Sequence, residues 1–260
     1  MTSSHTKQDT STDTGHDGIH VISVFSGSRG IGRAELILYH GRHAVRKVYP
    51  EESAHCLDRE YEIMEKFGGV RPEIPEVLEK GQNYLICPYY HNEINIYMKP
   101  DGILPRCLMP LRAAKQALDV LQFFHEQGYA IIDFHPGNVL YSRKFGMKII
   151  DYEYAQKYRG AIPPFQASYA LQGTPTDFKG DVPLGWPVER SPYDVKWKPY
   201  TGLTLHSLLN DPTWLQHLKR TCFQVKRFIM LYAKCLLALL LTERQYAGLR
   251  SRFRGRHSKQ

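Results

Sequence analysis

The stretch GYAIIDFHPGNVLYSRKFGMKIIDYEYA, residues 128–155, decides the predicted fold of this chain. It places Asp133, Asn138 and Asp151 at the ends of apolar segments that are typical of buried β-strands, with strands predicted at NVLYS and MKIID. Polar side chains at such positions either complete turns or hold a charged ligand. The parts of the chain around this stretch decide between the two interpretations.

The N-terminal part predicts a small antiparallel sheet followed by a helix. Three alternating segments, HVISVF, RAELILYH and HAVRKVY, are joined by the glycine-rich connections SGSRGIG and HGR, which is typical of a meander. Apolar Leu57, Tyr61, Met64 and Phe67 recur at helical spacing before two glycines, so a helix is expected there. The run NYLICPYY, broken by Pro88, predicts a strand that leaves its sheet and connects two lobes.

The remaining segments predict helices around one long loop. Apolar residues recur every three or four positions from Leu111 to Gln127, just before a glycine, which predicts a helix with one buried face. Residues 158–200 are dense in Pro and Gly and predict a functional or disordered loop. Its aromatic residues argue for order, namely Phe165, Tyr169, Phe178, Trp186, Tyr193 and Trp197. From about Gly202 the chain again predicts helix.

Length and composition predict a globular protein of a reducing compartment. A chain of 260 residues with 42% hydrophobic residues can form one substantial domain or two small lobes that share a cleft. Residues 1–17 are polar and lack an apolar run, so we expect a disordered tail and no secretory signal. The five cysteines are widely spaced and form no CxxC pair, which disfavours a disulfide framework or zinc site and favours the cytoplasm.

The basic charge of the chain belongs to its C-terminal end. The formal net charge is +8, and residues 214–260 contain eleven Lys or Arg but one acidic residue, Glu243. Such an end suits an anionic surface, either nucleic acid or a membrane, in which case the protein would be peripheral at the inner face of the membrane. Nucleic acid is not expected, because no stacking or base-reading motif accompanies the charge.

The most hydrophobic run of the chain, FIMLYAKCLLALLL at residues 228–241, has two interpretations. As a helix its fourteen residues span about 21 Å, which is less than the hydrocarbon core of about 30 Å, so it should not cross a membrane. A buried helix of the C-terminal part is the favoured prediction. The alternative is a helix that lies on an anionic membrane surface, because basic residues flank the run.

The order of these parts resembles that of the protein-kinase-like superfamily over residues 20–155. AVRKVY resembles the strand that carries the phosphate-binding lysine, IIDFHPGNVL resembles the catalytic loop, and IIDYE resembles the metal-binding aspartate segment. The resemblance implies a two-lobed α+β fold. Its N-lobe at 18–90 would hold the small antiparallel sheet, its C-lobe at 91–242 would be mainly helical, and a basic tail would follow at 243–260.

The same resemblance implies that ATP and Mg²⁺ are the cofactors and assigns five residues to the active site. Asp133 would orient the acceptor hydroxyl and take its proton, while Asn138 and Asp151 would bind Mg²⁺ through hard oxygen atoms. Lys47, held in place by an ion pair with Glu60, would bind the α- and β-phosphates. Phosphoryl transfer needs positioning and charge neutralisation more than covalent chemistry, which explains why these residue types are required.

The glycine-rich turn FSGSRGIG is a weaker match. Gly27 and Gly30 align with the second and third glycines of a kinase phosphate loop, whereas Phe25 stands at the first position. The backbone amides of this turn could still cover phosphates. Glycines that merely form a hairpin turn are the alternative interpretation.

Several positions depart from the pattern of protein kinases. Ile131 and Ile132 replace the usual His-Arg pair, so control by a phosphorylated activation loop loses its anchor. His135 stands where protein kinases carry lysine, and its imidazole would have to help with the γ-phosphate. Glu153 replaces the glycine of the Asp-Phe-Gly segment and adds a carboxylate that could face the metal.

These departures favour the atypical side of the superfamily. IIDYEYA resembles the corresponding segment of choline kinases, and FHPGNVL resembles bacterial lipopolysaccharide kinases and UbiB-type atypical kinases. The implied activity is transfer of the γ-phosphate of ATP to a hydroxyl of a cell-envelope saccharide or other small molecule. A protein serine/threonine kinase and an ATP-binding pseudokinase remain the alternatives.

Overall fold

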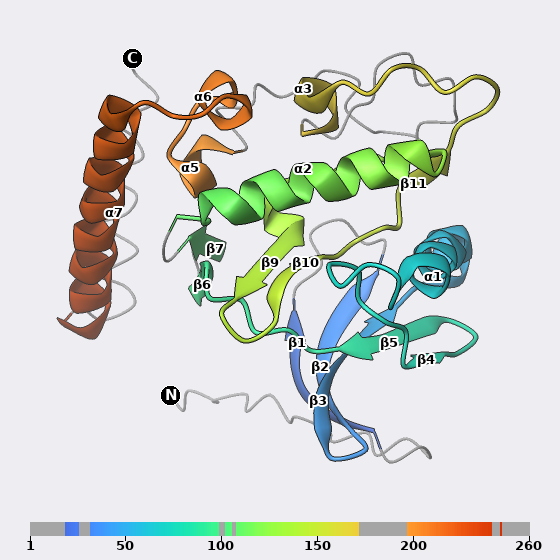
Figure 1. Cartoon of the computed structure of the whole chain (residues 1–260). Helices are drawn as coiled ribbons and strands as arrows, with labels where there is room; N and C mark the ends of the chain where they lie inside the picture. The colour runs from blue at the N-terminus through green and yellow to red at the C-terminus, as the bar shows by residue number, and fades with distance from the viewer. Residues whose placement is uncertain are drawn as a thin grey trace, which may run out of the picture.

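Over the residues that the computed structural model describes, the chain is a mixed α+β protein with a five-stranded antiparallel sheet and several helices (Figure 1). The described residues are 19–25, 32–98, 102–105, 108–171, 197–240 and 245. The predicted tail at 1–17 and the predicted phosphate-binding glycines Gly27 and Gly30 lie outside them.

The predicted meander is confirmed as the first three strands of the sheet. β1 (His20–Phe25), β2 (Arg33–Tyr39) and β3 (Arg42–Val48) pair in sequence, and all pairs are antiparallel. β5 (Tyr84–Pro88) then pairs with β3, and β4 (Glu79–Lys80) forms the far edge, so the order is β1-β2-β3-β5-β4. The β2–β3 turn is tight because His40 and Gly41 both adopt positive φ, as a two-residue hairpin turn of this type requires.

The predicted helix after the meander is also confirmed. It begins with a short 3-10 turn, η1 (Glu51–Ser53), and continues as α1 (Ala54–Phe67), which buries one apolar face. The helix ends at Gly68, where a Cβ atom would lie 2.3 Å from the backbone oxygen of Met64. A side chain at this position would clash with the backbone of Met64, so glycine is required here.

The helix predicted at 111–127 is confirmed as α2 (Leu111–Glu126), and it forms the centre of the molecule. In Figure 1 it lies between the five-stranded sheet and the helices of the C-terminal part. One continuous cluster of buried hydrophobic side chains joins α2 to α1 and to the strands that follow α2. At its middle the Phe67 ring contacts three other rings edge-on, those of Phe123, Phe124 and Tyr129, with centroid distances of 5.4 to 5.6 Å.

Residues 128–157 fold into two nested pairs of antiparallel strands. The inner pair, β9 (Val139–Ser142) with β10 (Gly146–Ile149), confirms the two predicted strands, and the outer pair is β8 (Tyr129–Ile131) with β11 (Ala155–Lys157). A 3-10 turn, η2 (Pro136–Asn138), leads into β9. Because the pairs are nested, the segment after β8 and the segment after β10 are brought side by side.

Short elements complete the fold. β6 (Asn95–Met98) and β7 (Gly102–Pro105) form a separate hairpin before α2. After β11 come α3 (Ala167–Ala170), α5 (Lys198–Thr201), α6 (Leu205–Leu209) and the long α7 (Trp214–Leu240). Of the aromatic residues expected to order the loop at 158–200, Phe165 packs against the core and Trp197 is fully buried. Three of them lie outside the described residues, namely Phe178, Trp186 and Tyr193.

Trp197 links the C-terminal part to the loop after β8. Its ring packs on the ring of Phe134 at a centroid distance of 5.5 Å, and its Nε1 donates a hydrogen bond to the backbone oxygen of Leu171 at 2.6 Å. Phe134 is itself buried and follows Asp133 directly. The loop that contains Asp133 is therefore attached to the C-terminal part by a contact between two buried aromatic rings.

The favoured prediction that residues 228–241 form a buried helix is wrong. The described part of this run belongs to α7, and Ile229 and Leu236 are 62% and 58% exposed. Hydrophobicity shows that a segment seeks an apolar neighbour, but it does not show that the same chain supplies one. Among the described residues no helix is long and apolar enough to pass through a bilayer.

The expectation that the cysteines form no disulfide agrees with the described part of the chain. Cys56, Cys87 and Cys222 carry free thiols. The side chains of Cys107 and Cys235 are not among those described.

Candidate active site

Lys47 stands at the centre of the candidate site. It lies on β3, between Ala34 of β2 and Leu85 of β5 in the sheet register. Its Nζ donates to both carboxylate oxygens of Glu60 on α1, at 2.8 and 2.9 Å, and to Oδ1 of Asp151 at 3.0 Å. The predicted ion pair with Glu60 is therefore present, and Lys47 also bridges to the segment after β10.

The charge of Lys47 is maintained by its acidic neighbours. Burial lowers the pKa of the Lys47 ammonium, but the carboxylates of Asp151 and Glu60 raise it by more, so that it lies well above its usual value of 10.5. Glu60 is almost completely buried, with its side chain 2% exposed. A buried carboxylate of this kind requires a partner, because an unpaired buried charge is strongly destabilising.

Tyr49 is a further member of the site that the sequence analysis missed. It follows Lys47 by two positions and lies one residue beyond the end of β3. Its hydroxyl donates a hydrogen bond to Oε2 of Glu60 and also contacts Glu153. Burial and the charge of Glu60 raise the pKa of Tyr49 well above its usual value. The sequence gives no signal for this role, because only the contact with Glu60 reveals it.

The loop after β8 holds Asp133, His135 and Asn138 through its own hydrogen bonds. Asn138 is buried, and its Nδ2 donates to the backbone oxygen of Asp133 at 3.4 Å. Nδ1 of His135 accepts a hydrogen bond from the backbone N–H of Gly137 at 3.0 Å. Nε2 of His135 lies 4.0 Å from Oδ2 of Asp133. His135 therefore faces the aspartate with one nitrogen and braces the loop with the other.

The loop after β10 is joined directly to the loop after β8. The backbone N–H of Ile150 donates to the backbone oxygen of Asn138 at 2.9 Å, which brings the segments of the two predicted metal ligands together. Tyr152 anchors the second loop, because it is fully buried and its hydroxyl donates to the backbone oxygen of Ile149 at 2.9 Å. Asp151 and Glu153 flank Tyr152 in the sequence, and their carboxylates lie near that of Glu60.

Asp133 and Asp151 share an uncommon backbone conformation. Their φ angles are +63° and +75°, in the left-handed region that non-glycine residues seldom adopt. The conformation costs roughly 1–2 kcal/mol for a residue with a Cβ atom, and Asp and Asn tolerate it best. Positions of this kind cluster at functional sites, where the surrounding structure enforces them.

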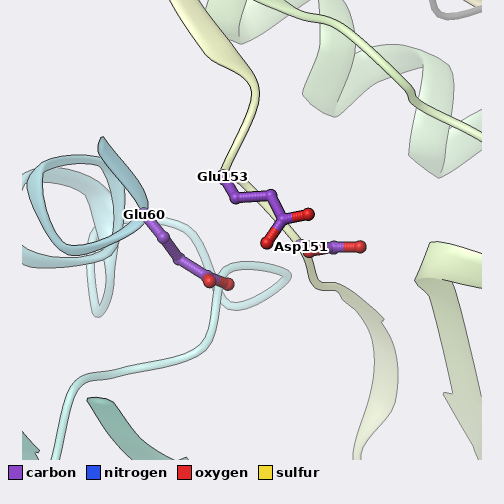
Figure 2. A group of neighbouring side chains, drawn as sticks. All are labelled: Glu60, Asp151 and Glu153. Carbon is purple, nitrogen blue, oxygen red and sulfur yellow. The ribbon is translucent and has the colours of Figure 1, made fainter. Parts of the chain in front are cut away.

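Three carboxylates converge at the site, as Figure 2 shows. Glu60 reaches it from α1, and Asp151 and Glu153 come from the segment between β10 and β11. Each offers one oxygen atom, and these atoms all lie within 4.8 Å of one another. Hard oxygen donors at this spacing suit Mg²⁺ or another divalent cation. The cluster contains the predicted ligand Asp151, and Asn138 lies on the adjoining loop.

The surroundings of Glu153 disfavour the charged form of its carboxyl group. Burial and the neighbouring charge of Asp151 raise its pKa from 4.5 to about 7, against the opposing effect of Lys47. The folded protein therefore binds this proton more tightly than the unfolded chain does. The resulting stabilisation is fully present below about pH 4.5 and is lost as the pH rises through about 7.

We expect Glu153→Gln to stabilise the protein in metal-free buffer, and to do so more at pH 8 than at pH 5. At pH 8 the gain should be about 1–2 kcal/mol, after allowance for partial solvent screening, or about 2–4 °C in Tm. Thermal denaturation at both pH values measures it. Glu52→Gln, an exposed residue of η1, is the control and should change Tm equally little at both. A gain that does not depend on pH would contradict the electrostatic explanation.

Comparison with known proteins adds no assignment, because the chain matches no family model and a search of curated proteins finds no significant match.

Proposed function

We propose that this chain is an ATP-dependent phosphotransferase with a two-lobed protein-kinase-like fold, and that ATP and Mg²⁺ are its cofactors. The observation that carries the proposal is the bridge from Lys47 to both Glu60 and Asp151. In this proposal the sheet and α1 form the N-lobe, and the elements from α2 onward form the C-lobe. The site would lie where the two lobes meet.

The arrangement of the acidic side chains supports the metal assignment. Asp151 and Asn138 would hold Mg²⁺, with Glu153 as a further carboxylate beside them, because all three present hard oxygen atoms on adjoining loops. Bound Mg²⁺ would neutralise negative charge on the phosphates. The protein would contribute positions that are fixed by the paired strands, since phosphoryl transfer rewards fixed geometry.

In the proposed reaction each side chain has one task. Lys47 donates hydrogen bonds to phosphate oxygens, and Glu60, itself hydrogen-bonded by Tyr49, holds the Lys47 side chain in place. Asp133 accepts the proton of the acceptor hydroxyl. The acceptor oxygen forms a bond to the γ-phosphorus, the bond between that phosphorus and the β–γ bridging oxygen breaks, and ADP leaves. His135, close to Asp133, would assist with the γ-phosphate.

The acceptor that we favour is a saccharide of the cell envelope or another small molecule. Ile131 and Ile132 are both buried, Ile132 against Ala130 and Tyr154, so the positions before Asp133 serve packing. They offer no charge to anchor a phosphorylated loop. This supports a site that needs no activation by phosphorylation, as expected for an enzyme of small molecules.

Transfer from labelled ATP tests the proposal. With Mg²⁺ present, the wild type should bind ATP and pass its γ-phosphate to a saccharide fraction of envelope extract. Lys47→Met should lower kcat/KM by at least about a hundredfold, since it removes a charge aimed at the phosphates. Lys115→Met is the matched control, because Lys115 is exposed and its surface ion pair with Asp211 contributes little.

Each outcome of this experiment has a distinct meaning. Label in a protein fraction instead of the saccharides would support a protein serine/threonine kinase. If the wild type binds Mg-ATP but transfers no more label than Lys47→Met, the chain is an ATP-binding pseudokinase and the enzyme proposal fails.

A further inference from the structure

We propose that α7 docks on the surface of an anionic membrane, with its exposed apolar face inserted at the level of the lipid headgroups. This inference is independent of the proposed phosphotransfer. It depends on three properties of α7: its apolar stripe, the polar character of its opposite face, and its charge.

The apolar stripe runs along most of α7. Its members follow one another at intervals of three, four or seven residues, which places them on one face of the helix. They are between 51% and 71% exposed, and they are Leu218, Val225, Ile229, Tyr232, Leu236 and Leu240. Trp214 at the start of the helix is 76% exposed and continues the stripe. Aromatic residues of this kind are typical of helices at a membrane interface.

The opposite face of α7 contacts the rest of the protein through polar side chains. Arg220 donates to the backbone oxygens of Thr201 and Met109 at 2.9 and 2.8 Å. Gln216 donates to Oγ of Ser207, and Gln224 accepts from the backbone N–H of Leu108, both at 2.5 Å. The helix thus turns hydrogen-bonding groups inward and leucines outward. A helix surrounded by water would be expected to do the reverse, so this orientation indicates an apolar partner on the outside.

The positive charge of α7 indicates which kind of apolar partner fits the stripe. The helix contains five Lys or Arg and no Asp or Glu. Lys219 and Lys226 are exposed and seven residues apart, so they lie in one row along a border of the stripe. In Figure 1 α7 stands at the edge of the molecule, next to α5 and α6 and away from the five-stranded sheet. An apolar stripe bordered by lysines complements a bilayer whose surface carries anionic lipids.

Other occupants fit less well. A second copy of the chain would bring two helices together that both carry positive charge and no acidic residue, and like charges at an interface are costly. Nucleic acid would satisfy the lysines but would leave the aliphatic stripe in water. Residues 1–18 of this chain have no apolar run with which to cover it.

Flotation of the full chain with lipid vesicles tests the inference. The protein should float with vesicles of phosphatidylcholine and phosphatidylglycerol but only weakly with phosphatidylcholine alone. Binding should weaken when salt is raised from about 0.1 M to about 1 M, which shortens the Debye length from about 10 Å to about 3 Å. Ile229→Ser with Leu236→Ser should lower the partition coefficient at least about tenfold. Lys219→Glu with Lys226→Glu should lower it at least about twentyfold.

Matched controls separate the helix from the rest of the surface. Val70→Ser with Leu78→Ser removes two exposed apolar side chains far from α7 in the sequence, and Lys144→Glu with Lys157→Glu makes the same charge change elsewhere. Both control variants should retain at least about half of the wild-type binding.

Three outcomes would overturn the inference. The first is a stripe variant that floats as well as the wild type, and the second is a wild type that does not float at all. The third is a wild type that sediments as a dimer, does not bind vesicles and becomes monomeric in the stripe variant. That result would identify a second copy of the chain as the occupant.

Discussion

Asp133→Asn is expected to lower kcat for phosphotransfer by about a thousandfold while the affinity for Mg-ATP changes by less than about threefold. The substitution removes the proposed proton acceptor, and general-base catalysis contributes about 10²- to 10⁴-fold. It keeps the shape of the side chain, and asparagine tolerates the positive φ of +63° at this position as well as aspartate does. Steady-state kinetics together with calorimetric ATP binding separate the two effects.

Two further variants complete this first test. Asp119→Asn, on the exposed side of α2, should leave both kcat and ATP affinity unchanged. Asp133→Ala should lose the same activity and also about 1 kcal/mol of stability, because alanine is strained at positive φ. A kcat for Asp133→Asn within about tenfold of the wild type would remove Asp133 from the role of base.

Asp151→Asn is expected to abolish the Mg²⁺ dependence of ATP binding and to lower turnover by more than about a thousandfold. The change removes a charged oxygen ligand from the cation, and it removes one of the two acidic partners of Lys47. Asparagine again suits the local backbone, whose φ is +75°. ATP titrations in the presence of Mg²⁺ and of EDTA measure the first effect, and single-turnover transfer measures the second.

A matched control exists for this second test as well. Asp58 accepts from Lys80 at 2.8 Å, a carboxylate–lysine contact similar to that of Asp151 but 67% exposed. Asp58→Asn should therefore leave binding and turnover unchanged. Retention of Mg²⁺-dependent ATP binding in Asp151→Asn would show that the metal is held elsewhere, and the ligand assignment would be wrong.

The parts of the fold that were predicted correctly are those whose pattern has a local cause. β2 alternates because one face of the sheet is buried, and α1 and α2 repeat every three or four residues because each buries one side. The short strands β4, β6, β7 and β11 were not predicted. With two to four residues each, they are too short to show a period and form only because a partner strand lies beside them.

The prediction of the candidate site did not depend on a periodic pattern, and it was correct only in part. The resemblance to the protein-kinase-like superfamily selected Lys47, Glu60 and Asp151, which the structure brings into contact. Tyr49 was missed because a tyrosine beside a strand is usually a packing residue, and only its contact with Glu60 distinguishes it. The exposure of α7 could not be predicted either, since it depends on which surfaces the other elements leave available.

The contacts of Lys47 have a consequence for the order in which ligands bind. A lysine ammonium has three donor hydrogens, and here two point to Glu60 and one to Asp151. A phosphate oxygen that binds Lys47 must therefore replace one of these acceptors, and Asp151 is the more exposed one. A bound cation would stabilise the Asp151 carboxylate once it no longer contacts Lys47. In the proposed enzyme each ligand would thus raise the affinity for the other by the same factor, so nucleotide and metal would bind as a cooperative pair.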